Sequence, residues 1–365
     1  RVVSVTNATE LQNALTNALP GDRIELAAGT YTQSGGFSIL SGGNGTQSNP
    51  VTLTAASGQT PIIDCTVCSG TAVITANSVS YWVFKDFTVG TVNGNWGIHL
   101  KTSKNIRLEN IGMQAQITSV MDSLFKDDNG AEDIVIDGGT YTFDTHASLI
   151  DSSAKNIIIR NIVVGNIDQT VNTGVEGMIE LHTNAENAII EYSRFFNFFG
   201  SGSNPVRFIH VYNRTRGSRI HHNLFYKVWR GVYLQDSGNI TVDHNVFDQN
   251  GDALTDTTGG YNRINHNIFT RNTNAIRNLQ LSTNIIQYND FYQNGGSVPA
   301  GMDATNKFGA AAVDPVFVDW NNAAFGSRDY HLTSGSPLKD TGDSAYPAIP
   351  VGGGSRVDMG AYEYG

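Results

Sequence analysis

Side chains able to do acid–base chemistry recur at similar places in successive segments of the sequence. Six segments open with alternating apolar residues and read IHLK, LFK, LID, IELH, IHVY and VYLQ. Aligned on their last residues, they give one column, formed by Lys101, Lys126, Asp151, His182, Tyr212 and Gln235. Two residues earlier stand His99, Glu180, His210 and Tyr233, while Leu124 and Leu149 interrupt the polar pattern. A solvated face more usually carries Thr, Ser, Asn and Asp, so the column indicates a functional site, with a solvated face as the open alternative.

A cationic stretch reinforces this indication. Residues 206–231 contain no Asp or Glu, and their cationic side chains are Arg207, Arg214, Arg216, Arg219, Lys227 and Arg230. The whole chain has a formal net charge of −10, so the stretch creates a local field of opposite sign. Arginine forks suit carboxylates, and Trp229 or Tyr233 could stack on a sugar face. We therefore expect an anionic ligand, although some of these arginines could simply pack along the strands.

Cleavage of a uronate-containing polysaccharide by β-elimination fits these residue types. The reaction needs a neutralised carboxylate, a base for the adjacent proton and a proton donor for the leaving oxygen. His182 is the expected neutral base, since histidine has a reference pKa near ~6.5, and Lys126 is the alternative. Tyr212 is expected to donate or relay the proton, and Asp151 to orient the imidazole. The expected substrate-binding residues are Lys101, Glu180, His210, Arg214, Arg216, Lys227, Arg230 and Tyr233.

Two other functions remain open. A glycoside hydrolase would need two carboxylates at a set separation across the scissile bond. Asp151 and Glu180 are the best candidates for that pair, followed by Asp127 and Asp128. The third possibility is a carbohydrate-binding or structural protein without turnover.

A fixed repeat indicates the fold that positions these residues. Asn223, Asn245, Asn267 and Asn289 lie 22 residues apart in the near-copies IHHNLF, VDHNVF, INHNIF and IQYNDF. Short strands on a turn of this length, without helical stretches between them, predict an all-β, right-handed parallel β-helix. These asparagines, with Asn161, should form a stacked ladder at one bend, where asparagine tolerates left-handed backbone angles. The matching phenylalanines should stack in the core: Phe225, Phe247, Phe269 and Phe291.

The two ends of the chain differ from the repeats. Residues 2–32 read as a strand, a short amphipathic helix from about Thr9 to Ala18, and a strand, with Asn7 and Glu10 at capping-box spacing. A solenoid must cover its terminal strand edges, so we interpret this helix as a cap. We predict one domain, with an N-terminal cap over residues 1–50, coils over 51–310 and an irregular C-terminal cap over 311–365.

Composition restricts the remaining possibilities. The net charge argues against nucleic-acid binding, and no apolar run approaches the ~18 residues of a membrane span. Cys65 and Cys68 form a CxxC without the βαβ context of a redox motif, so a structural disulfide is expected, in keeping with a secreted protein. The two cysteines make a zinc site improbable. We read the chain as a mature secreted form, and covered ends favour a monomer.

Both ends resemble known proteins. The segments VTNATELQNALTNALPGDRIELAAGTYT and NPVTLTAASGQTPIID resemble the N-terminal region of chondroitinase B-like and alginate-lyase β-helix enzymes. The closing GSPLKDTGD…VDMGAYEYG resembles the end of many secreted bacterial β-helix proteins. The resemblance implies a pectate lyase-like solenoid and a polysaccharide lyase acting on an anionic polysaccharide.

The same resemblance exposes a departure at the site. In that family a lysine and an arginine on successive coils act with a calcium ion held by an asparagine and two acidic residues. IELHTNAEN is similar to the lysine-bearing strand and FIHVYN to the arginine-bearing strand, but this chain has His182 and Tyr212 at those positions. Only Glu176 and Glu180 are nearby as acidic ligands, so no obligatory cofactor is expected, calcium included.

Overall fold

The computed structural model describes most of the chain. The described residues are 1–40, 42–65, 68, 71–92, 96–113, 122–128, 130–142, 148–169, 177–200, 207–212, 215–257, 260–278, 281–296, 301–346 and 356–362. The chain divides into two compact units, one of residues 1–188 with 200–204 and one of residues 189–199 with 205–365. Each unit is described by itself below.

The first unit consists of parallel sheets and one α-helix. In spatial order, one sheet contains β1 (Val2–Val5), β2 (Arg23–Leu26), β5 (Val51–Ala55), β8 (Ser80–Lys85), β11 (Lys104–Glu109), β14 (Glu132–Asp137) and β17 (Ile158–Arg160). The β4–β19 sheet contains β4 (Phe37–Ile39), β7 (Ala72–Asn77), β10 (Trp96–Lys101), β13 (Ser123–Asp127), β16 (Ser148–Ser152) and β19 (Gly177–Leu181). A further sheet contains β3 (Thr30–Gln33), β6 (Ile62–Cys65), β9 (Thr88–Val92) and β12 (Gly112–Met113). The strands β15 (Thr140–Tyr141) and β18 (Val163–Gln169) pair with each other.

The second unit repeats this arrangement. Its first sheet contains β20 (Ile189–Glu191), β23 (Arg219–His221), β26 (Thr241–Asp243), β29 (Arg263–Asn265) and β32 (Ile285–Gln287). The β22–β31 sheet contains β22 (Arg207–Val211), β25 (Arg230–Leu234), β28 (Asp252–Asp256) and β31 (Asn274–Arg277). The β21–β33 sheet contains β21 (Arg194–Gly200), β24 (Leu224–Val228), β27 (Val246–Asp248), β30 (Ile268–Thr270) and β33 (Asp290–Tyr292). The same sheet begins with β15 and β18.

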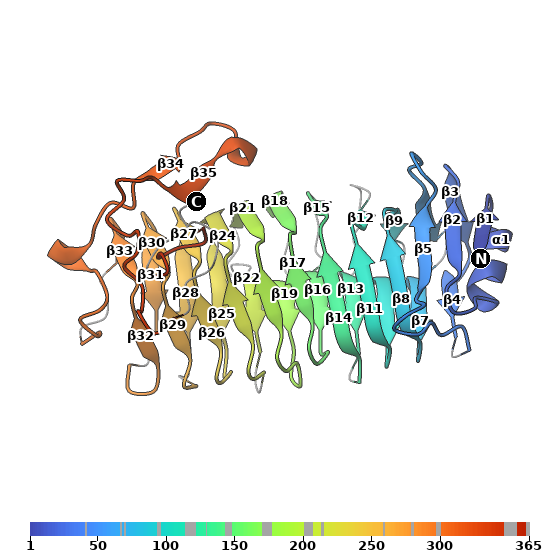
Figure 1. Ribbon diagram of the computed structural model, residues 1–365, viewed down its shortest axis with the longest axis horizontal. Helices are drawn as coiled ribbons and strands as arrows, with labels where there is room; N and C mark the ends of the chain where they lie inside the picture. Colours follow the sequence, from blue (N-terminus) through green and yellow to red (C-terminus); the bar gives the residue numbers. More distant parts are fainter. Residues whose placement is uncertain are drawn as a thin grey trace. The chain divides into compact units, whose positions relative to one another are not determined.

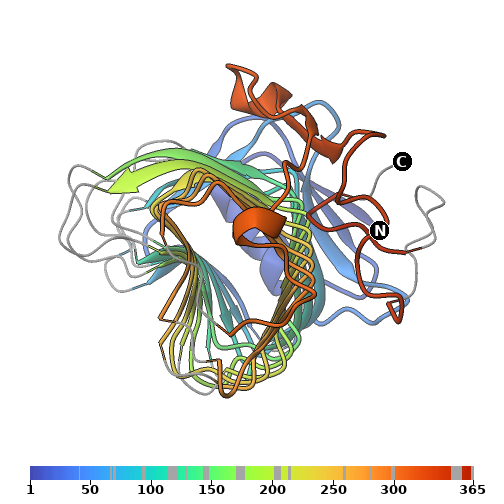
Figure 2. The ribbon, with the colours of Figure 1, turned by 90° about the vertical axis from the view of Figure 1, so that its left-hand side faces the viewer.

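Strands of one sheet therefore come from successive coils, not from neighbouring segments of the chain (Figure 1). Every pairing between these strands is parallel among the residues described, and the short strands alternate inward and outward side chains. The predicted all-β, right-handed parallel β-helix is confirmed. Seen end on in Figure 2, the yellow to orange coils of the second unit lie over one another around their core.

Inward side chains form the core as columns, one residue per coil. In the second unit the rings of Phe225, Phe247, Phe269 and Phe291 stack with centroids 4.7 to 5.0 Å apart, as predicted, and Phe195 precedes them. All five are buried. The spacing matches the distance between adjacent strands, so each ring covers the next without a gap.

The asparagine ladder is confirmed in the second unit, with its backbone geometry corrected. The amide oxygen of each asparagine accepts from the backbone N–H of the preceding one, as for Asn245 and Asn223 at 3.0 Å, and the ladder ends at Asn306. The left-handed backbone angle belongs to the residue before each ladder asparagine, for example His222 (φ 53°) before Asn223. Asn161 has this left-handed position itself (φ 56°), is exposed and donates to Asp137, so its place in the ladder was wrong.

A second ladder was missed by the sequence analysis. Asn250, Asn272 and Asn294 lie at another bend of the same coils, and the amide oxygen of each accepts a backbone N–H from the coil before it, at 2.9 to 3.0 Å. Their spacing is also 22 residues, so the signal was present in the sequence.

The N-terminal helix α1 (Ala8–Thr16) covers the start of the first unit, as predicted. Asn7 caps it by accepting from the backbone N–H of Glu10 at 3.0 Å, and Glu10 reaches back to the N–H of Thr6 at 2.8 Å. The Gln12 side chain then bonds both backbone groups of Ser38 in the edge strand β4, at 2.9 and 3.1 Å. The helix thus occupies the hydrogen-bonding edge that a further strand would otherwise extend.

Residues beyond β33 close and flank the second unit. Lys307 exchanges backbone hydrogen bonds with the last coil, and in Figure 2 the short helix η1 (Gly309–Ala311) lies over its end. The antiparallel hairpin of β34 (Phe317–Asp319) and β35 (Asp329–Leu332), with η2 (Phe325–Ser327), packs on the β21–β33 sheet. There the hydroxyl of Tyr330 donates to the buried Asp248 at 2.7 Å, and Phe325 stacks on Phe196.

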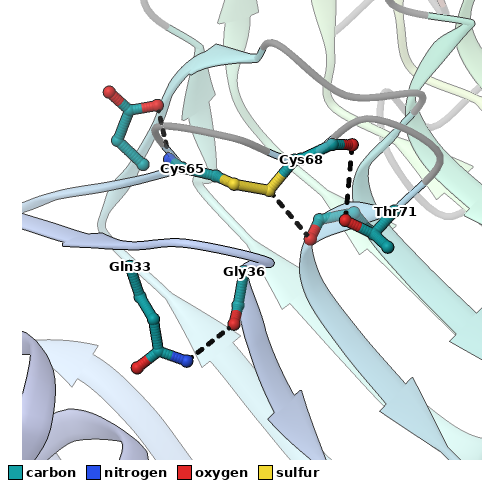
Figure 3. The surroundings of a disulfide bond; sticks show 7 residues. Gln33, Gly36, Cys65, Cys68 and Thr71 are labelled. Carbon is teal, nitrogen blue, oxygen red and sulfur yellow. Dashed lines mark hydrogen bonds between the residues drawn. A yellow bond between two sulfur atoms is a disulfide. The ribbon is translucent and has the colours of Figure 1, made fainter.

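The predicted disulfide between Cys65 and Cys68 is present (Figure 3). It closes the turn after β6, and the backbone carbonyl of Cys68 accepts from the Thr71 hydroxyl at 3.3 Å. Within the described residues, no helix is long and apolar enough to cross a membrane.

Candidate active site

The β4–β19 sheet has an outward polar column, but its register differs from the one predicted from the sequence. Lys126 lies opposite His99 on one side and Asp151 on the other, and Asp151 lies opposite Glu180. The column is therefore formed by His99, Lys126, Asp151 and Glu180. Lys101 lies two residues after His99, and His182 lies two residues after Glu180. A shift of two residues keeps a side chain on the same face. Aligning the buried residues that precede the column would have given the correct register: Ile98, Phe125, Ile150 and Ile179.

Four charged side chains meet in this column and form what we call the Asp151 cluster: Lys126, Asp151, Glu180 and His182. The amino group of Lys126 lies 2.7 Å from one oxygen of Asp151, and His182 Nε2 lies 3.0 Å from the other. The same Nε2 lies 3.0 Å from Glu180 Oε2. His182 follows β19 directly, and its side chain is 33% exposed. The structure thus brings together two predicted catalytic side chains, Lys126 and His182, around the predicted orienting carboxylate.

The electrostatics change the role expected for His182. Burial lowers the pKa of the His182 imidazole, but the hydrogen bonds and charges of Asp151 and Glu180 outweigh burial and raise its pKa to about 9. Burial acts to raise the pKa of the Asp151 carboxyl, yet the hydrogen bonds from His182 and Lys126 leave it below its usual range. At neutral pH the imidazole is therefore cationic. This environment argues against the predicted role of His182 as a neutral base and favours a role as a proton donor.

A second imidazole lies further along the same sheet. His99 is 3% exposed, packs against the Trp96 ring at 4.4 Å and places Nε2 3.0 Å from Asp128. Burial lowers the pKa of His99 despite this carboxylate. Asp128, a reserve candidate for a hydrolase, is thus engaged with His99.

Asp127 faces the interior, contrary to its candidacy as a hydrolytic carboxylate. It lies opposite Leu100, is 4% exposed and accepts from the backbone N–H of Ser153 at 2.7 Å. Burial raises the pKa of Asp127 to about 7. The sequence DD at 127–128 does not reveal which carboxylate points outward, because that depends on the strand register.

In the second unit, aromatic and cationic side chains gather on the β22–β31 sheet. His210 lies opposite Tyr233, its ring centroid is 3.6 Å from that of Tyr212, and its Nε2 is 2.9 Å from the Gln235 amide oxygen. The guanidinium of Arg207 lies 4.4 Å from the Tyr233 ring centroid, and that of Arg230 lies 5.7 Å from it. We call this group the Tyr233 cluster; it contains four of the predicted residues, His210, Tyr212, Arg230 and Tyr233.

The cationic stretch does not form one patch. Arg230 contacts Asp252 at 3.3 Å, Arg219 pairs with the buried Asp243, and Lys227 lies 5.2 Å from the Tyr226 ring centroid on β24. Arg216 is exposed beside the bend before β23, so it and Lys227 belong to other sides of the coil than Tyr233. Arg214 lies outside the described residues, as does Glu176. Residues 206–231 contain no Asp or Glu, but Arg219 and Arg230 form ion pairs with acidic residues of later coils, which the stretch alone does not indicate.

The donor set does not suggest a metal centre in the part of the chain that the structure describes: no three His, Cys, Asp or Glu side chains there are grouped to hold an ion. Asp151 Oδ1 and Glu180 Oε2 each lie 3.0 Å from His182 Nε2, and Lys126 contacts the other oxygen of Asp151. The Asp151 cluster is suited to proton transfer by side chains.

Fold and site together define a right-handed parallel β-helix protein with a polar column on one sheet. Two family models match parts of the chain: "Pel9A-like, right handed beta helix region" over residues 3–131 and "Right handed beta helix region" over residues 207–319. No curated protein sequence matches the chain.

Several solved structures share the fold. Pectate lyase Pel9A is 16% identical, with a TM-score of 0.67, over 100% of this chain and 97% of that one. A rhamnogalacturonan lyase is 12% identical, with a TM-score of 0.51, over 87% and 91%. An alginate lyase from Paenibacillus sp. str. FPU-7 is 18% identical, with a TM-score of 0.48, over 81% and 98%. At these identities the likeness to pectate lyase Pel9A and to the rhamnogalacturonan lyase shows the fold alone, and the chemistry must be argued from the site.

Proposed function

We propose that this protein is a secreted polysaccharide lyase that cleaves a uronate-containing polysaccharide, alginate-like or a related polyuronate, by β-elimination. One observation carries the proposal: Asp151 holds an amino group and a cationic imidazole within 3.0 Å on one outward face. A lysine and an imidazolium can supply the base and the acid that the elimination needs. The architecture shared with pectate lyase Pel9A supports the same class of reaction.

The proposed mechanism assigns the base role to Lys126, the alternative named from the sequence. Its unprotonated amino group takes the proton beside the uronate carboxylate, and the electron pair left behind forms a carbon–carbon double bond. The bond to the leaving glycosidic oxygen breaks, and His182 gives that oxygen its proton. Asp151 holds both groups in place and stabilises the positive charge that Lys126 acquires when it takes the proton.

Within the second unit, the Tyr233 cluster is proposed to bind sugar residues. The Tyr233 ring offers an apolar face for stacking, and Arg207 and Arg230 offer guanidinium groups for a carboxylate. Tyr212 is kept as a candidate for proton transfer, and Lys101, Arg214, Arg216 and Lys227 as candidates for substrate contacts.

Ultraviolet absorbance tests the reaction class. We expect incubation with alginate, chondroitin, pectate or glucuronan to raise absorbance for at least one of these polymers, because elimination leaves a conjugated double bond. New reducing ends without absorbance would point to hydrolysis instead. Retention of a polymer without turnover would point to a binding protein.

Lys126→Ala tests the assignment of the base. Loss of a general base lowers turnover by about 10²- to 10⁴-fold, and we expect a loss in that range with the fold retained. Lys155→Ala is the matched control, because Lys155 is an exposed lysine of the same unit that pairs only with Glu186 in the contacts described. Equal activity of Lys126→Ala and the control would exclude Lys126 as the base.

A glycoside hydrolase is the second candidate, favoured by the separation of Asp151 and Glu180. One oxygen of each lies 3.0 Å from His182 Nε2, so these oxygens are at most about 6 Å apart, a bound that allows the spacing of retaining enzymes. Such an enzyme also needs a protonated carboxyl group, whereas His182 and Lys126 lower the pKa of Asp151. This makes the hydrolase the weaker candidate.

We propose that catalysis does not depend on calcium. The proposal rests on the side chains of the Asp151 cluster, where His182 Nε2 lies 3.0 Å from one oxygen of Asp151 and one of Glu180, and Lys126 contacts the other oxygen of Asp151. We expect turnover to survive dialysis against EDTA. Loss of turnover that added calcium restores, with the folded state unchanged by circular dichroism, would contradict it.

A further inference from the structure

Glu180 uses its two carboxylate oxygens for different tasks. One oxygen, Oε2, lies 3.0 Å from His182 Nε2. The other, Oε1, accepts a hydrogen bond from the Ser148 hydroxyl at 2.8 Å and one from the backbone N–H of Gly177 at 2.9 Å. Glu180 is 8% exposed, so these contacts are made largely out of solvent.

The two donors to Oε1 come from adjacent strand starts. Ser148 begins β16 and Gly177 begins β19, and these strands pair in register with Ile150 opposite Ile179. The Glu180 side chain therefore runs back along β19 to reach both donors. Two donors to Oε1 hold the carboxylate in one orientation, and in that orientation Oε2 points at the His182 imidazole.

We propose that Ser148 acts through Glu180 as a positioning residue, which fixes the His182 ring beside Lys126 and Asp151 and keeps the ring protonated. Among the contacts described, the Ser148 hydroxyl reaches Glu180 and not His182. The consequence for turnover rests on the proposed lyase function. The consequence for the imidazole does not depend on it.

The charge state of the imidazole supports this proposal. His182 shares one ring nitrogen between Asp151 and Glu180, and both carboxylates contribute to raising its pKa to about 9. A Glu180 carboxylate that loses the Ser148 bond is less firmly held near the ring. The protonated form of the imidazole then loses part of its stabilisation.

Histidine titration by NMR on the intact protein tests the proposal directly. In Ser148→Ala we expect the His182 midpoint to fall by about 1 pH unit, the equivalent of one hydrogen bond to a charged group. In Glu180→Gln, which removes the charge, we expect a larger fall. An unchanged His182 midpoint in folded Ser148→Ala would overturn the proposal.

Ser123→Ala is the matched control. Ser123 lies opposite Ser148 on β13, is fully buried, and its hydroxyl has no hydrogen-bond partner among the described residues. We expect this variant to titrate like the wild type. A midpoint that falls equally in Ser123→Ala and Ser148→Ala would mean that any loss of a buried hydroxyl loosens the sheet, which also overturns the proposal.

Turnover separates this inference from the proposed function. If the protein is a lyase, the alkaline limb of its pH–rate profile should move down in Ser148→Ala in parallel with the NMR midpoint. Absence of turnover on every polymer would refute the lyase while the titration still decides the role of Ser148. A shifted midpoint with an unshifted pH–rate profile would show that Ser148 sets the imidazole but that His182 is not the acid.

Discussion

Asp151 lies within 3.0 Å of both Lys126 and His182, and its charge favours the protonated form of the His182 imidazole. The imidazole stays protonated until the pH passes its raised pKa of about 9. If His182 is the proton donor, kcat/KM must fall as the pH rises through that value. We expect an alkaline limb near pH 9 in the pH–rate profile, and a limb near ~6.5, the reference value for a free histidine, would contradict the assignment.

The same shift predicts a pH-dependent contribution to stability. The folded-state pKa of His182 is raised, so its contribution is complete below ~6.5 and is lost as the pH rises through about 9. After allowance for partial exposure, the contribution is roughly 1–2 kcal/mol. His182→Gln should therefore lower the melting temperature at pH 6 and make little difference at pH 10.

Asp127 gives the opposite signature, because it is an acid whose pKa is raised. Burial raises the pKa of Asp127 to about 7, so the folded state favours the protonated carboxyl and stability falls as the pH rises from ~4 to 7. Asp127→Asn keeps an oxygen for the Ser153 N–H and removes the charge. At pH 8 we expect this variant to have a higher melting temperature than the wild type, with a free energy of unfolding larger by roughly 1–3 kcal/mol. At pH 4 the two proteins should be equally stable. A variant that is less stable at pH 8 would show that the charge is accommodated.

At the scale of the elements, the asparagine ladders hold successive coils in register. Asn245 donates to the backbone carbonyls of Ile220 and Asp243 and accepts from the backbone N–H of Asn223, all in buried surroundings. Removing the amide leaves these backbone groups unpaired. Asn245→Ala should therefore cost about 3 kcal/mol or more in the free energy of unfolding, measured by urea titration.

Asn321→Ala is the control for that measurement. Asn321 lies in an exposed turn of the same unit, and its side chain makes none of the hydrogen bonds described. We expect a change within about 0.5 kcal/mol. If both variants lost the same stability, the ladder would have no special role.

The repeat made the coils predictable and left their register open. A spacing of 22 residues identifies the unit, and alternation identifies the face that each side chain takes. Alternation cannot distinguish a residue from the one two positions away, so His182 was placed opposite Asp151 where Glu180 stands. The electrostatic role of His182 was missed for the same reason, because Glu180 was not expected beside it.

At the scale of the whole molecule, contacts between distant segments could not be predicted from local patterns. Tyr330 and Asp248 are 82 residues apart in sequence, and the C-terminal hairpin carries no periodic signal that indicates its docking place. Arg271 similarly lies 3.5 Å from the ring of Trp320. These contacts depend on the surface left free by the coils, which exists only after the strands have stacked.

A stack of imidazoles under the C-terminal segment predicts acid sensitivity. His222, His244 and His266 stack with centroids 4.7 to 5.1 Å apart, and His266 Nε2 accepts from the backbone N–H of Asp343. Burial lowers the pKa of His222 and His266 to about 3. Their contribution to the free energy of unfolding is therefore complete above pH ~6.5 and decreases as the pH falls. At pH 5 each of these two histidines has lost about 2 kcal/mol of that contribution.

We expect limited proteolysis at pH 4 to release C-terminal fragments before it cuts the coils. His266→Gln should weaken this acid sensitivity, since a glutamine oxygen can accept from Asp343 without titrating. Cleavage patterns that are the same at pH 7 and pH 4 would contradict the expectation.

The Gln12 side chain has a consequence for assembly. It satisfies the backbone groups of Ser38 on β4, whose free edge would otherwise recruit a strand from another molecule. Gln12→Ala would leave that edge open without disturbing the buried Leu11 and Leu15, so the folded variant should self-associate into fibrillar or end-to-end aggregates at high concentration. The side-chain amide of Gln12 is therefore expected to keep copies of this protein from associating through the edge of β4.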